Sequence, residues 1–261
     1  MADYETITFD ASGPAIWVTL NRDDVRNAFN GRMLADLLDV FEAAPKVPGG
    51  RVVVLTGVGS AFCAGADLNW MRAVRDFTYE QNLEESNQVA AVMRRIYDCP
   101  LPTIARVNGP AIGGGAGLVA CCDLAVAAES VRFSLSEVKL GLIPSCISPY
   151  VIKKIGEGNA RELFLTGERI SAQKAREIGL VNEVAREGEL DAVVARWVNQ
   201  LVTSGPVAIA KCKELIRNVP QMGLDEAGPY TAKMIAKMRT SEEGQEGMAA
   251  FLEKRKPGWA E

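Results

Sequence analysis

The chain has 261 residues, of which 29 are basic and 33 acidic, so its formal net charge is −4. This balance argues against a nucleic-acid partner, although a local basic cluster could still hold a phosphorylated ligand. The sequence contains no histidine, which excludes Ser-His-Asp and Cys-His catalysis, HExxH zinc sites and histidine general bases together. Acid–base chemistry must therefore come from carboxylates, tyrosine, lysine or cysteine.

The remaining composition points to a reducing compartment. The six cysteines show neither CxxC spacing nor the density of a small disulfide-rich scaffold, so we expect free thiols. Residues 1–5 are acidic and short of apolar side chains, unlike a signal peptide. No apolar run approaches the roughly 18 residues that a membrane span needs. We therefore expect a cytoplasmic protein with no membrane partner and no metal.

The first part of the chain predicts strands and helices in alternation. Residues 7–9 and 15–20, separated by Ser-Gly-Pro, have the pattern of a strand hairpin. Apolar side chains then recur at helical spacing over residues 33–41. The continuous apolar run 52–57 predicts a buried strand. The turn at residues 64–67 opens another helix.

A second strand–turn–helix unit follows an amphipathic helix over residues 81–97. It consists of a strand at 104–107, a glycine-rich turn, a short helix toward Cys122 and a further apolar run at 124–128. Consecutive glycines cost chain entropy, so we expect them where the backbone must approach something closely. Where such a turn opens a helix, free backbone N–H groups form a site for negative charge. We interpret that charge as the oxyanion of an activated carbonyl.

From Val151 onward the chain looks almost wholly helical. Ser171 is expected to cap a helix that Gly179 ends. Further helical features are an apolar stripe over 193–202, a helix that begins near Pro206, a helix over 221–238 and a basic, aromatic tail over 251–259. We predict an α/β core over residues 1–199 and a helical oligomerisation region over 200–261. Apolar stripes on such an appendage favour an oligomer.

Two other interpretations of the glycine-rich stretch need weighing. It contains no GxxxxGK[ST], which excludes a P-loop. Gly115-x-Gly117-x-x-Ala120 fits the loose dinucleotide fingerprint, with Glu137 about 20 residues further on. However, residues 108–114 separate the strand from this fingerprint, and the helix that follows is very short. A purely structural glycine turn stays open as an alternative.

Three side chains near these turns are candidates for chemistry. Glu137 has mostly apolar neighbours in the sequence, which would favour its neutral form and suit a group that both takes and gives a proton. The alternative is a capping glutamate, or one paired with Lys139 or Arg132. Asp67 most simply caps the helix that it precedes. Cys63 could be an activated thiol, but without a histidine we favour a packed one.

In its motifs and their order, the sequence resembles the crotonase (enoyl-CoA hydratase/isomerase) superfamily over essentially the whole chain. The motifs that carry the resemblance are Arg26-Asn27-Ala28, Ala61 to Leu68, Asn108 to Gly115, Cys122-Asp123-Leu124, Glu137-x-x-x-Gly141-x-x-Pro144, Leu165-Thr166-Gly167, Ala172-x-x-Ala175 with Gly179-Leu180-Val181, and Phe251-x-Glu253-Lys254-Arg255-x-Pro257.

The resemblance implies a spiral of ββα units with a helical C-terminal trimerisation region, assembled as a homotrimer or a hexamer of two trimers. It also implies an acyl-CoA thioester substrate and no cofactor beyond the CoA of that substrate. Glu137 would be the catalytic acid–base, and the backbone N–H groups of Ala66 and Gly114 would hold the thioester oxygen. Substrate-binding positions carried over from the family are Arg26, Ala64, Asp67, Leu68, Gly113, Gly117, Pro144 and Lys254.

The sequence departs from the family pattern in two places. Two-glutamate hydratases carry their first catalytic glutamate where this chain has Gly117, so only Glu137 is kept. The usual glycine-rich run after Pro144 is replaced by residues 145–150, Ser-Cys-Ile-Ser-Pro-Tyr. These features resemble a bacterial branch assigned as methylglutaconyl-CoA hydratase-like. We therefore expect hydration of a short or branched enoyl-CoA, with a single-glutamate Δ-isomerase, an acyl-CoA decarboxylase and a non-catalytic binding protein as alternatives.

Overall fold

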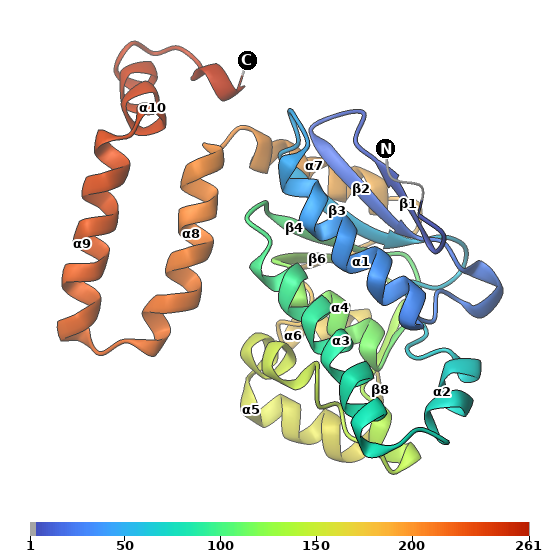
Figure 1. Cartoon of the computed structure of the whole chain (residues 1–261). Coiled ribbons are helices and arrows are strands. Elements are labelled where there is room, and N and C mark those ends of the chain that lie inside the picture. The colour runs from blue at the N-terminus through green and yellow to red at the C-terminus, as the bar shows by residue number, and fades with distance from the viewer. Residues whose placement is uncertain (1–3, 261) are drawn as a thin grey trace.

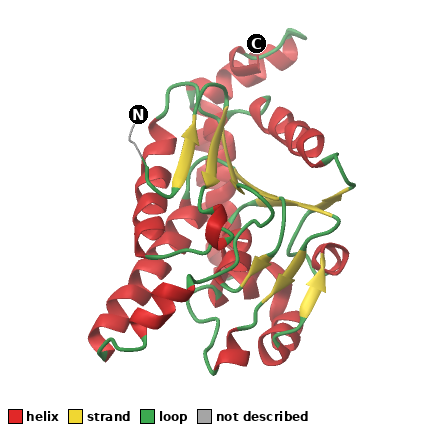
Figure 2. Cartoon of the chain, turned by 90° about the vertical axis from the view of Figure 1, so that its right-hand side faces the viewer, coloured by secondary structure: helices red, strands yellow, loops and turns green. Residues whose placement is uncertain are grey.

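The computed structural model describes residues 4–260 and is organised around two sheets. The larger has the order β1-β2-β3-β4-β6-β9, and only its first pair, β1 and β2, is antiparallel. The smaller has the order β5-β7-β8. Figure 2 shows the two groups of strands separately. The strands are β1 (Ile7–Asp10), β2 (Ala15–Leu20), β3 (Val52–Gly57), β4 (Thr103–Val107), β5 (Ala111–Ile112), β6 (Leu124–Ala128), β7 (Arg132–Ser134), β8 (Arg169–Ser171) and β9 (Glu183–Ala185).

Helices cover the larger sheet, which confirms the predicted α/β class (Figure 1). They are α1 (Gly31–Ala43), α2 (Leu68–Val74), α3 (Tyr79–Asp98), α4 (Gly114–Cys121), α5 (Ser148–Thr166), α6 (Ala172–Glu177), α7 (Leu190–Val202), α8 (Pro206–Asn218), α9 (Leu224–Thr240) and α10 (Glu242–Leu252). Within residues 4–260, none of these helices has the length and apolar character required to traverse a bilayer.

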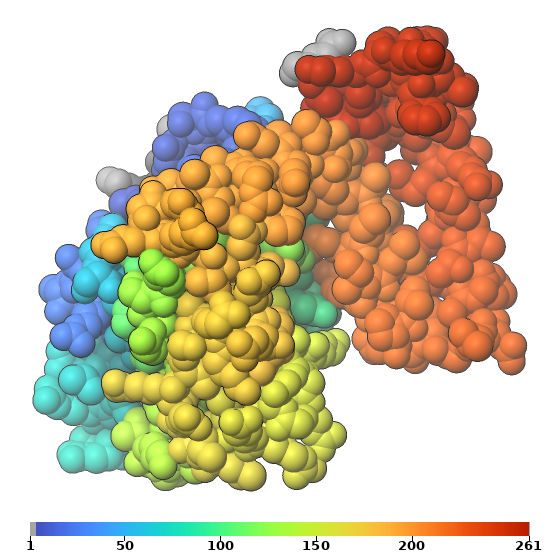
Figure 3. All heavy atoms as spheres, turned by 180° about the vertical axis from the view of Figure 1, so that it is seen from behind, coloured from blue at the N-terminus to red at the C-terminus, as the bar shows by residue number. Residues whose placement is uncertain are grey.

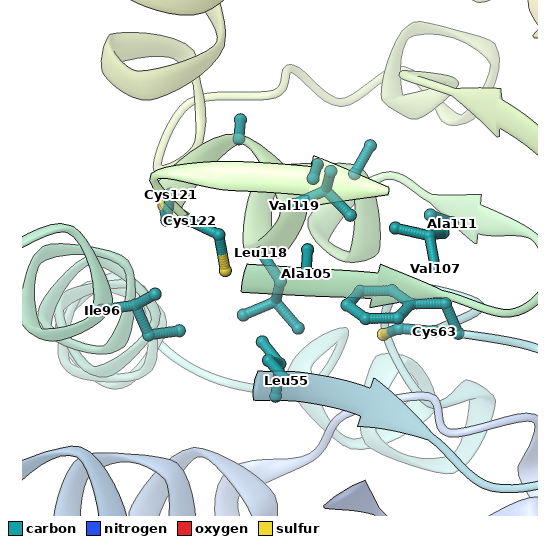
Figure 4. Close-up of a cluster of buried hydrophobic side chains, with 14 of the residues drawn as sticks. Leu55, Cys63, Ile96, Ala105, Val107, Ala111, Leu118, Val119, Cys121 and Cys122 are labelled. Carbon is teal, nitrogen blue, oxygen red and sulfur yellow. The ribbon is translucent and has the colours of Figure 1, made fainter. Parts of the chain in front are cut away.

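The central strand β3 shows why its sequence is apolar throughout. Val53 and Leu55 pack into the main core, whereas Val52 and Val54 pack against α7 on the opposite face. Because successive side chains alternate between faces, a strand covered on both sides needs apolar residues at every position. Figure 4 shows the main core between strands and helices, with Leu55, Leu118 and Cys63 among its buried side chains.

Two strand–turn–helix units provide the scaffold of the site. β3 leads through the turn at residues 64–67 into α2, and β4 leads through the glycine-rich turn into α4. Isolated bridges join Phe29 to Ala66 and Cys63 to Ala111. The backbone therefore ties the two turns, distant in sequence, to each other.

The chain after Val151 is mostly helical, as expected, but that expectation missed two short strands. β8 joins the small sheet and β9 extends the large one by pairing with β6. Each of these strands has only three residues, too few to show a period, and their pairing is a tertiary effect. The helix α10 was also not predicted, and the stretch 251–259 interpreted as a tail overlaps it only at residues 251 and 252.

The apolar stripe over residues 193–202 is covered by the chain's own sheet. Val194 and Val198 of α7 pack against β3, β4 and β6. The helices α8, α9 and α10 instead stand to one side of the body (Figures 1 and 3). The division at residues 199/200 and the trimerisation role of the second part stay predictions.

Buried polar contacts tie α8 to the body. Lys213 donates to Asp123 Oδ2 at 2.5 Å and to the Leu101 carbonyl at 2.9 Å. Asp123 Oδ2 also accepts from the N–H and hydroxyl of Thr103 at 2.8 and 2.9 Å. The Lys213 side chain is only 9% exposed and that of Asp123 is 31% exposed, so the lysine is shielded from water while the carboxylate stays partly accessible.

We predict that Lys213→Met lowers the free energy of unfolding by about 2 kcal/mol, because it leaves Asp123 partly buried without its cation. Urea denaturation measures this loss. The matched control is Lys211→Met on the same helix, where the exposed pair with Glu214 should contribute less than about 0.5 kcal/mol. Equal losses in the two variants would contradict the prediction.

Candidate active site

A cavity of about 370 Å³ lies where the two turns meet the segment after β7. Its walls are largely apolar and include Phe29, Trp70, Leu142, Ile143 and Ile147. The structure brings together at this cavity the following residues predicted from the sequence: Ala64, Ala66, Leu68, Gly113, Gly114, Glu137 and Pro144.

Four other predicted site residues do not line the cavity: Arg26, Asp67, Gly117 and Lys254. Arg26 is exposed, and its carbonyl oxygen accepts the Ala64 N–H at 3.0 Å, so it contacts the turn through its backbone. Lys254 is exposed in the tail after α10. The substrate-binding roles carried over to these four residues stay predictions.

Buried Asn27 forms hydrogen bonds with the loop that leads into the Ala66 turn. This residue has a left-handed backbone (φ 57°). Its amide nitrogen donates to the carbonyls of Val58 and Ala61, each at 2.9 Å, and its amide oxygen accepts the Arg22 N–H at 2.9 Å. A fully satisfied buried amide of this kind fixes the loop in one conformation.

The bridge to Phe29 orients the N–H of Ala66. Phe29 donates to the Gly65 carbonyl at 2.8 Å and accepts from the Asp67 N–H at 3.0 Å. In parallel pairing, the residue between these two partners points its own N–H and C=O away from the neighbouring strand. Among residues 4–260, the N–H of Ala66 has no hydrogen-bond partner.

Asp67 caps α2, as predicted. Its Oδ1 accepts the N–H groups of Asn69 at 2.7 Å and Trp70 at 3.4 Å, and its Oδ2 pairs with Arg22 at 2.7 Å. Burial alone would raise the pKa of Asp67, but these hydrogen bonds and the Arg22 charge outweigh it and hold that pKa below its usual value. Asp67 is therefore an ionised structural carboxylate.

The second turn presents the N-terminus of α4 to the same cavity. Gly113 has a left-handed φ of 53° and donates its N–H to the Ser134 carbonyl at 2.7 Å. Gly114, the first residue of α4, has an N–H without a partner in the part of the chain that the structure describes. Such N–H groups, with the helix dipole behind them, favour negative charge.

Glu137 lies against this turn with a partly buried carboxyl group. A Cβ on Gly113 would come within 2.9 Å of Glu137 Oε1, so the glycine allows this close approach. Within residues 4–260, Oε2 is buried without a hydrogen-bond partner, and neither Lys139 nor Arg132 pairs with the carboxylate. The paired alternative was therefore wrong. Burial raises the pKa of Glu137.

Gly117 lies behind the cavity wall, beneath Ile147. A Cβ at Gly117 would come 2.1 Å from Ile147 Cγ2. Ile147 is 3% exposed and lines the cavity itself. An apolar side chain therefore occupies the space into which the first glutamate of a two-glutamate hydratase would extend.

Sequence reasoning missed the supporting residues Phe29 and Ile147. Phe29 follows the quoted motif Arg26-Asn27-Ala28, which was the only available signal for it. Ile147 lies in the departing segment 145–150 and gave no signal. The expectation for Cys63 was correct, because the residue is fully buried and burial raises the pKa of its thiol to about 12.

Comparisons with known proteins identify the family to which the chain belongs. A family model described as enoyl-CoA hydratase/isomerase matches residues 11–261. The crystal structure of an enoyl-CoA hydratase from Shewanella pealeana is similar with a TM-score of 0.95 and 39% identity, covering 98% of this chain and 96% of that one. The chain is also 34% identical over 241 residues to 2,3-dehydroadipyl-CoA hydratase from Escherichia coli, covering 92% of each. It is 31% identical over 260 residues to short-chain-enoyl-CoA hydratase from Clostridium acetobutylicum, covering 97% of each.

We predict that Gly117→Ala destabilises the protein by about 1–3 kcal/mol, because the new methyl group would overlap Ile147 in a packed wall. Gly158→Ala is the control. Gly158 also lies in a helix, but a Cβ there has no neighbour within 4 Å. That change should stabilise by about 0.5–1 kcal/mol, and chemical denaturation of both variants tests the contrast.

The raised pKa of Glu137 predicts a pH-dependent stability difference. The folded protein binds this proton more tightly than the unfolded chain, so stability is fully present below the unfolded pKa and lost as pH rises through the folded value. Glu137→Gln, which cannot ionise, should therefore be more stable than the parent at pH 7. The advantage should vanish below the ordinary glutamate pKa of about 4.3. Unfolding curves at pH 4 and pH 7, with exposed Glu162→Gln as control, measure it.

Proposed function

We propose that this chain, which belongs to the enoyl-CoA hydratase/isomerase family and is an enzyme of that type, reversibly adds water across the α,β double bond of a short or branched enoyl-CoA. The crotonase-like membership that its motifs predicted is confirmed by the family match and the similar structures. The observation that carries the proposal is the partly buried carboxylate of Glu137, which within residues 4–260 has no salt-bridge partner and lies at the same cavity as the unpartnered N–H groups of Ala66 and Gly114.

The two N–H groups would stabilise the reacting thioester. As a nucleophile adds to the β-carbon, electrons move through the double bond to the thioester oxygen, which becomes an enolate oxyanion. Donors fixed in advance bind that charged state more strongly than the neutral carbonyl. By analogy with other oxyanion holes, each donor contributes about 3 kcal/mol to lowering the barrier.

Glu137 would move the protons. Its carboxylate takes a proton from water as the water oxygen bonds to the β-carbon, and the resulting carboxylic acid returns that proton to the α-carbon of the enolate. The enolate electrons form the new C–H bond, so no other acid is required. A carboxyl whose pKa is raised by burial suits both steps, because its acid and base forms lie closer in energy at neutral pH.

A specific observation favours a second candidate, a Δ-isomerase. Two-glutamate hydratases share the work between two carboxylates. This chain has Gly117, packed under Ile147, at the position of the first glutamate, so Glu137 is the single predicted catalytic carboxylate. One carboxylate suffices to lift an α-proton and return it to the γ-carbon. The relatives named as hydratases support hydration as the first candidate.

The finer features are proposed on the resemblance. They are a methylglutaconyl-like acyl group, contact of Arg26 and Lys254 with CoA, a homotrimer or hexamer, and a cytoplasmic location.

We predict that Glu137→Gln lowers kcat about 10³-fold, because it removes the proton-transferring group. The assay offers 2-enoyl and 3-enoyl CoA thioesters and measures product mass, since hydration adds about 18 mass units and isomerisation none. Glu162→Gln should retain full activity. Full turnover of the Glu137 variant on every thioester would refute the proposal, and products of unchanged mass from 3-enoyl substrates alone would establish the isomerase.

A further inference from the structure

Phe29 lines the cavity and contacts both predicted oxyanion donors. Its backbone pairs with Ala66, and its ring lies against Gly114. Its backbone forms the bridge that holds Gly65 and Asp67 on either side of Ala66. The Ala66 N–H direction therefore depends on where Phe29 lies. Phe29 is 5% exposed, so its position is set by packing.

The ring of Phe29 contacts the other donor residue. A Cβ on Gly114 would lie 2.3 Å from Phe29 Cε1 and 2.4 Å from Cζ, so the ring edge rests against the Gly114 backbone. This contact limits how far the start of α4 can move toward the Ala66 turn. Phe29 thus lies between the two N–H groups that must converge on one oxygen.

A second aromatic residue supports this ring from α2. The rings of Phe29 and Trp70 are 5.8 Å apart between centroids and inclined at 60°. Trp70 Nε1 donates to Glu85 Oε2 of α3 at 2.8 Å. The phenyl ring is therefore held between α2 and the glycine-rich turn, and its support extends to α3.

We propose that Phe29 is a positioning residue that sets the separation of the Ala66 and Gly114 donors. The proposal rests on the proposed function, because it assumes that both N–H groups bind the thioester oxygen. Donor geometry affects the charged transition state more than the bound substrate. Disturbing Phe29 should therefore lower kcat with little change in KM.

The test uses Phe29→Leu, Gly114→Ala and the double variant, with but-2-enoyl-CoA for kinetics. Phe29→Leu should lower kcat about 100-fold, the loss expected from displacing a reacting geometry by ~1 Å, while KM changes less than about threefold. Gly114→Ala should act in the same direction, because its methyl group meets the ring. Removing the ring relieves that overlap, so the loss of kcat in the double variant should be smaller than the product of the two single losses.

The carbonyl stretch of bound [1-¹³C]butanoyl-CoA, measured by infrared difference spectroscopy, reports the donors directly. In the parent enzyme this band should lie below that of free butanoyl-CoA, and in Phe29→Leu it should return toward the free position. Phe41→Leu is the control, since Phe41 is 1% exposed in the core and does not line the cavity. It should lose stability and keep both kcat and the band.

An unchanged kcat and band in Phe29→Leu, or losses in kcat that multiply fully in the double variant, would overturn the positioning role. If the parent enzyme shows neither butanoyl-CoA binding nor turnover, the proposed function fails, and this inference fails with it.

Discussion

The glycine-rich turn imposes a steric constraint on which the whole site depends. At Gly113, Gly114, Gly115 and Gly117, a Cβ would meet in turn the Glu137 carboxylate, the Phe29 ring, the Cys63 carbonyl and the Ile147 side chain. The absence of side chains here lets a carboxylate, an aromatic ring, a neighbouring backbone and a cavity wall all approach one short helix. Since interiors are packed at crystal density, such approaches cannot be recovered by small adjustments elsewhere.

The two carboxylates Asp67 and Glu137 have pKa values that their surroundings shift in opposite directions. Asp67 is buried but receives a guanidinium and backbone N–H groups, which lower its pKa. Burial raises the pKa of Glu137, and its own backbone N–H, which acts in the opposite direction, does not outweigh burial. Opposite shifts in neighbouring acids are typical of sites where one group holds the scaffold and the other exchanges protons. The unfavourable burial of Glu137 is tolerated because the surrounding sheets and helices are held by apolar packing.

The sequence predicted most of what depends on local chemistry. The strands β2 and β3, the helix α1, the Asp67 cap and the two glycine turns follow from periodicity, capping and chain entropy, and the motifs added the convergence of Ala66, Gly114 and Glu137. The three-residue strands β8 and β9 were missed because only tertiary pairing defines them. Phe29 and Ile147 were missed because the sequence does not show which residues an apolar side chain contacts. The apolar stripe of α7 was predicted, but the pattern alone does not reveal that the chain's own sheet covers it.

The contact between Ile147 and Gly117 also bears on how such enzymes diverge. A glutamate introduced at position 117 alone would collide with Ile147, and a small residue introduced at position 147 alone would leave a cavity in the wall. Each single change therefore lowers the stability of this protein. In this chain, a second carboxylate at position 117 requires a smaller residue at position 147 at the same time, or a prior gain in stability.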